Sequence, residues 1–212
     1  MRTPAQAWRE MERGNNRFIA GEPQHPRQDV ERRAEVSLGQ EPHAALFGCS
    51  DSRLSAEIIF DKGIGDLFVV RNAGQVISES VVGSLEYAVA VLNVPLIVVL
   101  GHDSCGAVLA AIDAQAEDAT PLPPHIRNLV SKIVPAVNRV ARTSGLAQTP
   151  EKVDSQEVGR EHLRDTINEL LESSELISDA IAAGTLAIVG ANYRLLEGRA
   201  VADVAVGALE AP

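Results

Sequence analysis

The sequence predicts an α/β fold with a parallel sheet, because short apolar segments alternate with segments of helical periodicity. Four apolar runs have the length of strands and little alternation, as is typical of strands covered on both faces. These runs are Ala44 to Gly48, Leu67 to Val70, Leu96 to Leu100 and Leu186 to Val189. The chain has 212 residues and no internal repeat, so we expect one domain with extensions.

The segment Pro4 to Ala20 is predicted to form an amphipathic helix before the first strand. Its large apolar side chains recur at roughly helical spacing among charged residues: Trp8, Met11, Phe18 and Ile19. Such a stripe must pack on another surface, either the body of the same domain or a partner subunit. The composition of Gly21 to Arg27 is typical of a loop that follows the helix.

Two further helices are predicted, one after the second strand and one before the fourth. In Val81 to Leu92 the apolar residues of one face are Val82, Leu85, Val89 and Leu92. Val158 to Ala183 carries a longer series with the same spacing: Leu163, Ile167, Leu170, Leu171, Ile177 and Ile181. Asp154 with Glu157 is a plausible start for this last helix, and Gly184 a plausible end.

Composition and charge exclude several classes of protein. Hydrophobic residues make up 45% and charged residues 23%, which are ordinary values for a globular chain. The net charge of -10 repels phosphate backbones and anionic membranes, so we expect neither nucleic acid nor a membrane as partner. The longest apolar run, Val94 to Gly101, is too short to cross a bilayer, and Met1 to Glu12 lacks the apolar region of a secretory signal. The expected location is cytoplasmic.

Two unusual polar clusters directly follow the first and third predicted strands. Gly48 to Arg53 reads GCSDSR, and Gly101 to Gly106 reads GHDSCG. Functional sites of open α/β sheets lie at the carboxyl ends of strands, where the strand order reverses. If the first and third strands are neighbours and the second lies beyond the first, both clusters meet at such a point. This arrangement needs only right-handed crossovers.

Cys49, His102 and Cys105 together offer two thiolates and an imidazole, a set of ligands that suits zinc. Three protein ligands with one open position are typical of catalytic zinc sites. The candidate for the fourth position is Asp51, which could bind the metal or accept a hydrogen bond from metal-bound water. Arg53 within reach of this carboxylate would hold it ionised and off the metal, which would make Asp51 a gate.

Other interpretations of these residues fit the sequence less well than a metal site. An isolated cysteine at a strand end is commonly a packing residue, but the joint pattern is more specific. A redox pair usually has the form Cys-x-x-Cys at the start of a helix, whereas Cys49 and Cys105 are far apart in sequence. A zinc module without catalysis would need the open position blocked. The histidines without such neighbours are expected on the surface or in loops: His25, His43, His125 and His162.

The chain resembles a beta-class carbonic anhydrase over roughly residues 5 to 205. The resemblance lies in the order and spacing of Cys49 to Arg53, Phe68 to Ala73, Leu85 to Val89 and Gly101 to Gly106. It implies a four- or five-stranded, mainly parallel sheet and zinc held by Cys49, His102 and Cys105. The implied reaction is reversible hydration of carbon dioxide to bicarbonate and a proton by zinc-bound hydroxide. An Asp51/Arg53 dyad would orient this nucleophile and gate the metal.

The resemblance implies further site residues and a subunit arrangement. Gln40 matches a substrate-orienting glutamine, Phe68 and Tyr87 match aromatics of a narrow apolar pocket, and the Gly106 N–H would serve the substrate oxygen. By residue type alone these would be a surface loop residue, two core residues and a turn former. The family forms dimers, often paired into tetramers, with active sites at the interface. The expected single domain 1–212 then has an N-terminal arm, 1–25, packing on a partner subunit, and a catalytic core, 40–205.

One position departs from a subset of the family. Members inhibited by bicarbonate at a second pocket carry Trp three residues before the first cysteine, where this chain has Leu46, although Arg71 and Tyr193 match. Together with Gln40, this favours the open type of site with water as the fourth ligand. A related enzyme on the same scaffold could hydrolyse carbon disulfide or carbonyl sulfide, but Phe68 and Tyr87 favour carbon dioxide.

Overall fold

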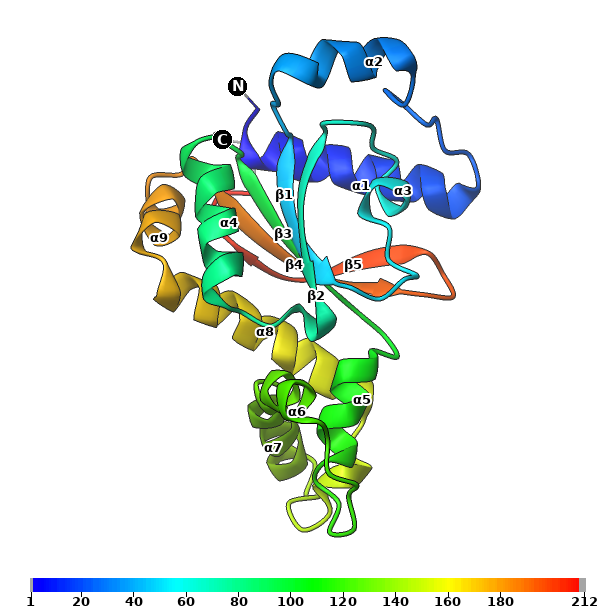
Figure 1. The fold of residues 1–212 in the computed structure, drawn as a ribbon, viewed down its shortest axis with the longest axis vertical. Coiled ribbons are helices and arrows are strands. Elements are labelled where there is room, and N and C mark those ends of the chain that lie inside the picture. The colour runs from blue at the N-terminus through cyan, green and yellow to red at the C-terminus, as the bar shows by residue number, and fades with distance from the viewer. Residues whose placement is uncertain (1, 210–212) are drawn as a thin grey trace.

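The computed structural model describes residues 2–209 around a five-stranded sheet with the order β2-β1-β3-β4-β5 (Figure 1). The strands are β1 Ala44–Cys49, β2 Leu67–Asn72, β3 Leu96–His102, β4 Ala187–Arg194 and β5 Arg199–Val206. Strands β1 to β4 are parallel, and β5 pairs with β4 in the antiparallel sense. The predicted α/β class and the mainly parallel sheet are confirmed. Residue 1 and residues 210–212, which the expected single domain includes, lie outside the described residues.

The predicted neighbours in the sheet are confirmed, because β1 lies between β2 and β3. Every residue of β1 and β3 is buried, as expected of strands covered on both faces. The same expectation is wrong for β2, whose residues are half-buried except for the exposed Arg71. Strand β2 has only β1 as a neighbour, so its outer edge is left open.

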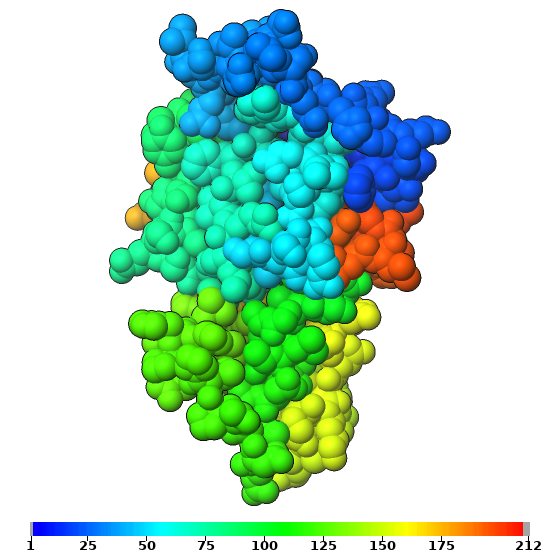
Figure 2. Space-filling model, turned by 45° about the vertical axis from the view of Figure 1, so that its right-hand side comes forward, coloured from blue at the N-terminus to red at the C-terminus, as the bar shows by residue number. Residues whose placement is uncertain are grey.

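Helices cover both faces of the sheet. They are α1 Pro4–Ala20, α2 Val30–Glu35, α3 Ala56–Ile59, α4 Glu79–Ala90, α5 Gly106–Asp113, α6 Pro124–Ser131, α7 Val134–Thr143, α8 Ser155–Ser173 and α9 Glu175–Ala182. One apolar cluster joins α1 and α3 with α5 to α7, and the other joins α4 and α9 with much of α8. Helices α5 to α7 form a lobe beyond the carboxyl ends of the parallel strands (Figures 1 and 2). None of the helices between residues 2 and 209 is both long and apolar enough to span a membrane.

Helix α1 has the predicted bounds and definite signals at both ends. The Thr3 side chain accepts a hydrogen bond from the Gln6 N–H at 3.2 Å, and Gly21 ends the helix with φ 72°. Trp8 and Met11 are buried in the core of their own chain. Asn15 donates to the carbonyls of Ile59 at 3.1 Å and Gly198 at 2.8 Å. The expected packing of this arm on a partner subunit stays a prediction.

The single helix predicted over 158–183 is wrong, because the chain breaks between α8 and α9 at Ser174. The Ser174 hydroxyl accepts from the Ile177 N–H at 3.2 Å and so starts a new helix. The predicted start is confirmed, since Asp154 accepts from the Gln156 N–H at 2.7 Å. Helix α9 ends at Ala182, two residues before the left-handed Gly184. Helices α2, α3, α5, α6 and α7 have no counterpart among the predicted elements.

Candidate metal centre

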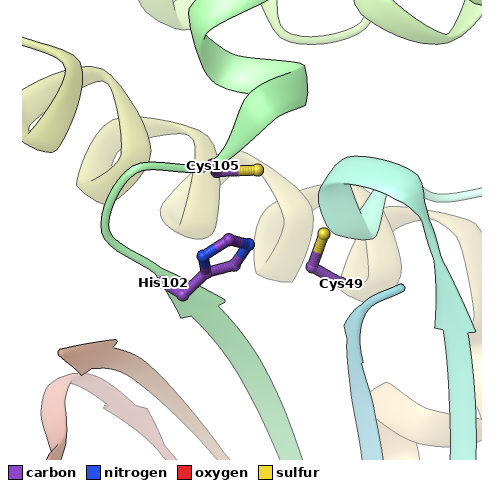
Figure 3. Close-up of side chains that lie close together, drawn as sticks. All are labelled: Cys49, His102 and Cys105. Carbon is purple, nitrogen blue, oxygen red and sulfur yellow. The ribbon is translucent and has the colours of Figure 1, made fainter. Parts of the chain in front are cut away.

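Cys49, His102 and Cys105 converge at the carboxyl ends of β1 and β3 (Figure 3). One ligand atom from each of the three lies within 4.8 Å of the others, and all three residues are buried. Cys49 is the last residue of β1 and His102 the last of β3, while Cys105 is the N-cap residue of α5. The predicted meeting of the two sequence clusters is therefore confirmed.

The ring of His102 is prepared to act as a ligand through Nε2. Its Nδ1 lies 2.8 Å from the Asp103 carbonyl oxygen, which can only accept, so Nδ1 carries the proton. Nε2 then has a free lone pair, and it is a buried atom without a hydrogen-bond partner. Buried polar atoms are rarely left unpaired, and a carbonyl that fixes the ring of a ligand histidine is typical of metal sites. Two thiols and this imidazole fit a zinc ion.

The charge state of the two thiols favours a cation between them. The adjacent Cys105 thiol lowers the pKa of Cys49 to about 4, and Cys49 in turn raises the pKa of Cys105. Burial alone would lower the pKa of His102, but the neighbouring Cys49 thiolate raises it. The pair thus gives up its first proton readily and retains the second, which a bound metal ion would displace.

Asp51 lies beside this cluster and forms a bidentate pair with Arg53. Arg53 Nε donates to Asp51 Oδ1 at 2.9 Å and its terminal nitrogen to Oδ2 at 2.7 Å. This guanidinium holds the pKa of Asp51 well below its usual range. Oδ2 is 3.9 Å from His102 Nε2, so the carboxylate borders the cluster. A role for Asp51 as fourth ligand or gate stays a prediction.

Arg71 holds the backbone that carries Cys49 and Asp51. Its Nε donates to the Cys49 carbonyl at 2.9 Å, and a terminal nitrogen donates to the Asp51 carbonyl at 2.6 Å. In the sequence Arg71 is part of the matching segment Phe68 to Ala73, and no such contact is predicted for it. The pairing of β1 with β2 could have indicated this role, because Arg71 lies opposite Gly48, the residue before Cys49.

The remaining predicted site residues divide into one that lies at the cluster and three that do not. Gly106 follows Cys105 directly and opens α5, where its N–H has no acceptor within the helix. Gln40 precedes β1, at the opposite end of that strand from Cys49. Phe68 pairs with Ala45 near the start of β1, four residues from the Cys49 position, or about 13 Å along a strand. Tyr87 packs with Phe68 at a ring distance of 6.1 Å.

The burial of the other histidines differs from expectation at one position. His25 and His125 are exposed, and His43 lies in the loop before β1, as expected. His162 is instead buried in α8, with 2% of its surface exposed. Glu161 precedes it and Leu163 follows it, so its immediate neighbours do not show whether it is buried or exposed.

The fold and the cluster define a class of protein: an α/β protein with a cluster of two thiols and an imidazole, able to hold a metal ion, at the carboxyl ends of its central strands. Residues 44–200 match the family model described as carbonic anhydrase. Carbonic anhydrase 2 of Mycobacterium tuberculosis is 52% identical over 198 residues, spanning 93% of this chain and 92% of that protein. The carbonic anhydrase of Mycolicibacterium smegmatis is 49% identical over 196 residues, spanning 92% and 91%.

Solved structures share the fold at lower sequence identity. A tetrameric beta-carbonic anhydrase from the ascomycete Sordaria macrospora aligns with a TM-score of 0.70 and 23% identity, over 91% of this chain and 95% of that one. A beta-carbonic anhydrase of Aspergillus fumigatus gives 0.71 and 23%, over 89% and 86%. The chain therefore belongs to the beta class of the carbonic anhydrase family, a family of lyases.

Proposed function

We propose that this chain catalyses the zinc-dependent, reversible hydration of carbon dioxide to bicarbonate and a proton. The observation that carries the proposal is the buried triad of Cys49, His102 and Cys105, with the lone pair of His102 Nε2 unpaired, in a chain of this family. These three residues would hold the zinc ion. Bound there, zinc would supply the Lewis acidity that makes a hydroxide nucleophile available from water.

Asp51 and Arg53 orient the nucleophile in this proposal. Asp51 is ionised near neutral pH, and Arg53 lowers its pKa further. Its Oδ2 faces His102 Nε2 at 3.9 Å. A carboxylate oxygen has more than one lone pair, so Oδ2 can accept from the attacking water while Arg53 binds it. A fixed acceptor lets the water present its lone pair to carbon dioxide in a constant direction. The free N–H of Gly106 is the donor for the substrate oxygen.

A second copy of the chain completes the site in this proposal. Gln40, Phe68 and Tyr87 do not reach the cluster of their own chain. Phe68 lies on the edge strand β2, and Tyr87 packs against it. Figure 2 shows the face around this edge in cyan and teal. Tyr87, which packs on Phe68 of β2, is exposed. A homodimer, alone or paired into a tetramer, would cover these residues. It would bring Gln40 and the two aromatic residues to the zinc site of the partner. The functional unit is then residues 1–212, with the arm 1–25 and the core 40–205.

Mixing two inactive variants tests whether the site is shared. Gln40→Ala retains the zinc ligands but lacks the glutamine, and Cys105→Ser lacks a ligand but retains the glutamine. After subunit exchange, half of the dimers are mixed and each has one intact site, so we expect activity to recover to about a quarter of wild type. Hydration assays before and after exchange measure this recovery. An unchanged low rate in confirmed mixed dimers would mean that each subunit builds its site alone.

The reaction itself is tested on the wild-type protein by stopped-flow hydration with the metal content measured. We expect about one zinc per chain, rapid hydration, loss of activity with a chelator and recovery with zinc. Zinc without hydration would leave a metal-binding module. A metal-free protein with a reversible disulfide between Cys49 and Cys105 would instead indicate redox chemistry.

A further inference from the structure

The turn between β2 and α4 lies against the sulfur of Cys49. This turn, η2 Ala73–Gln75, passes beside Cys49 in Figure 3. The Gly74 N–H donates a hydrogen bond to Cys49 Sγ at 3.4 Å. Hydrogen bonds to a ligand sulfur draw charge from it and so tune the metal that it binds. The orientation of one peptide group, between Ala73 and Gly74, is therefore connected to the metal centre.

Helix α8 also holds this turn, through two side chains. His162 Nε2 lies 2.7 Å from the Gly74 carbonyl oxygen, and Thr166 Oγ1 donates to the Gln75 carbonyl at 3.3 Å. The carbonyl can only accept, so Nε2 carries the proton. Nδ1 is buried without a partner, and burial lowers the pKa of this ring, so His162 is the neutral Nε2–H tautomer. His162 thus donates one directed hydrogen bond in a dry environment.

The turn is closely packed around Gly74. Gly74 has φ +74°, which favours glycine, and a Cβ there would lie 2.8 Å from Ala107 Cβ and 3.1 Å from Ile133 Cδ1. Gly74 is thus enclosed by the lobe of α5 to α7 and bonded on both of its polar atoms, to Cys49 through its N–H and to His162 through its carbonyl. A change at the carbonyl is transmitted to the N–H, because both belong to one residue in a fixed conformation.

We propose that His162 is a positioning residue of the metal centre, which fixes Gly74 so that its N–H is directed at the sulfur of Cys49. The inference rests on the proposed function, because it assigns a role toward the zinc ion that Cys49 would hold. The chain of contacts runs from α8 through Gly74 to a ligand atom and involves no residue that touches substrate. Loss of the His162 donor leaves the Gly74 carbonyl buried and unpaired, and the turn must shift to find water.

Two amide variants test the proposal with similar chemistry and different reach. In His162→Gln the amide nitrogen lies near the former Nε2 position and can donate to the Gly74 carbonyl. In His162→Asn the side chain is too short to reach this carbonyl. We expect His162→Asn to weaken zinc binding, measured by competition with a chromophoric chelator, by about 10- to 100-fold. The sulfur-to-metal charge-transfer band of its cobalt(II) form should also shift. His162→Gln should remain close to wild type in both measurements.

Thr166→Val is the matched control, since Thr166 binds the same turn one residue further from the sulfur. It should lower the melting temperature and leave zinc affinity and the cobalt band unchanged. Equal effects of His162→Asn and Thr166→Val on the cobalt band would overturn the proposal. Loss of any hydrogen bond to the turn would then change the metal centre, and His162 would have no specific role. Wild-type zinc affinity and spectrum in His162→Asn would overturn it as well.

A measurement on the wild-type protein keeps the proposal testable if His162→Asn does not fold. In protein loaded with cadmium-113, a scalar coupling between the metal and the Gly74 amide proton reports the N–H to sulfur hydrogen bond directly. We expect this coupling, together with ring nitrogen shifts of His162 typical of the Nε2–H tautomer. Absence of either overturns the inference. Failure of the proposed function is distinct, since wild type would then bind no zinc or hydrate no carbon dioxide.

Discussion

Replacing His102 with alanine is expected to remove bound zinc and abolish carbon dioxide hydration. Zinc sites with four protein ligands bind with about 10–16 kcal/mol, or about 3 kcal/mol for each ligand, so loss of one ligand weakens binding about 100-fold. His102 is one of the three clustered ligands, and its Nε2 has no hydrogen-bond partner among the described residues. Zinc content after dialysis and the stopped-flow hydration rate measure the two losses.

The same substitution should uncouple folding stability from zinc. A metal that binds only the folded chain stabilises it by about 2.7 kcal/mol at a hundred times its dissociation constant. Added zinc should therefore raise the melting temperature of wild type and leave that of His102→Ala almost unchanged. His125→Ala is the matched control, because His125 is exposed on α6. If His102→Ala retained its zinc and its hydration rate, the assignment of the triad would be wrong.

The strands and the metal triad could be predicted from sequence because their signals are local or repeated. Fully buried strands such as β1 and β3 are continuous apolar runs, and the ligands follow these runs directly. The meeting of Cys49 with His102 followed from one rule, that the carboxyl ends of parallel strands share an edge of the sheet. The break at Ser174 was not predictable in this way, because the apolar spacing continues from α8 into α9 and only a hydroxyl interrupts it.

Contacts between distant segments account for what the sequence did not predict. Helices α5 to α7 are short, and α5 is apolar on most sides because it lies between the sheet and its neighbours, so no helical period stands out. His162 and Gly74 are 88 residues apart and neither belongs to a motif. The expected roles of Gln40 and Tyr87 depend on the proposed second chain. These are features of tertiary and quaternary packing, which override local pattern.

Asp51→Asn is expected to lower kcat/KM for hydration by about 10- to 100-fold while zinc stays bound. Asparagine retains the size of the side chain, but its amide NH₂ faces the guanidinium of Arg53, which only donates. One of the two hydrogen bonds from Arg53, at 2.9 and 2.7 Å, must then break. The side chain turns, and the acceptor that faces the nucleophile loses its fixed direction. Hydration kinetics with zinc content measured in the same samples separate this loss from loss of metal.

Asp103→Asn is the matched control, since Asp103 is the neighbouring acid and its Oδ1 accepts from the Leu195 N–H at 3.1 Å instead of from Arg53. It removes a nearby negative charge without touching the Asp51 pair. A similar fall in kcat/KM for both variants would indicate a general effect of charge and contradict a specific role of Asp51.

The pH dependence of an Arg53→Gln variant separates orientation from ionisation. Arg53 lowers the pKa of Asp51, so the folded protein favours the charged carboxylate. This charged form stabilises the fold at pH values above the ordinary aspartate pKa of about 3.9, and the stabilisation is lost as the pH falls through the lowered pKa. Without Arg53 this pKa returns toward 3.9, and Asp51 is still ionised at pH 7. A fall in hydration rate at pH 7 must then come from a carboxylate that is no longer held in place and can turn toward His102 Nε2, 3.9 Å away. We expect that fall, with the acid limb of stability moved to higher pH. Wild-type activity at pH 7 in Arg53→Gln would show that the pair does not orient the nucleophile.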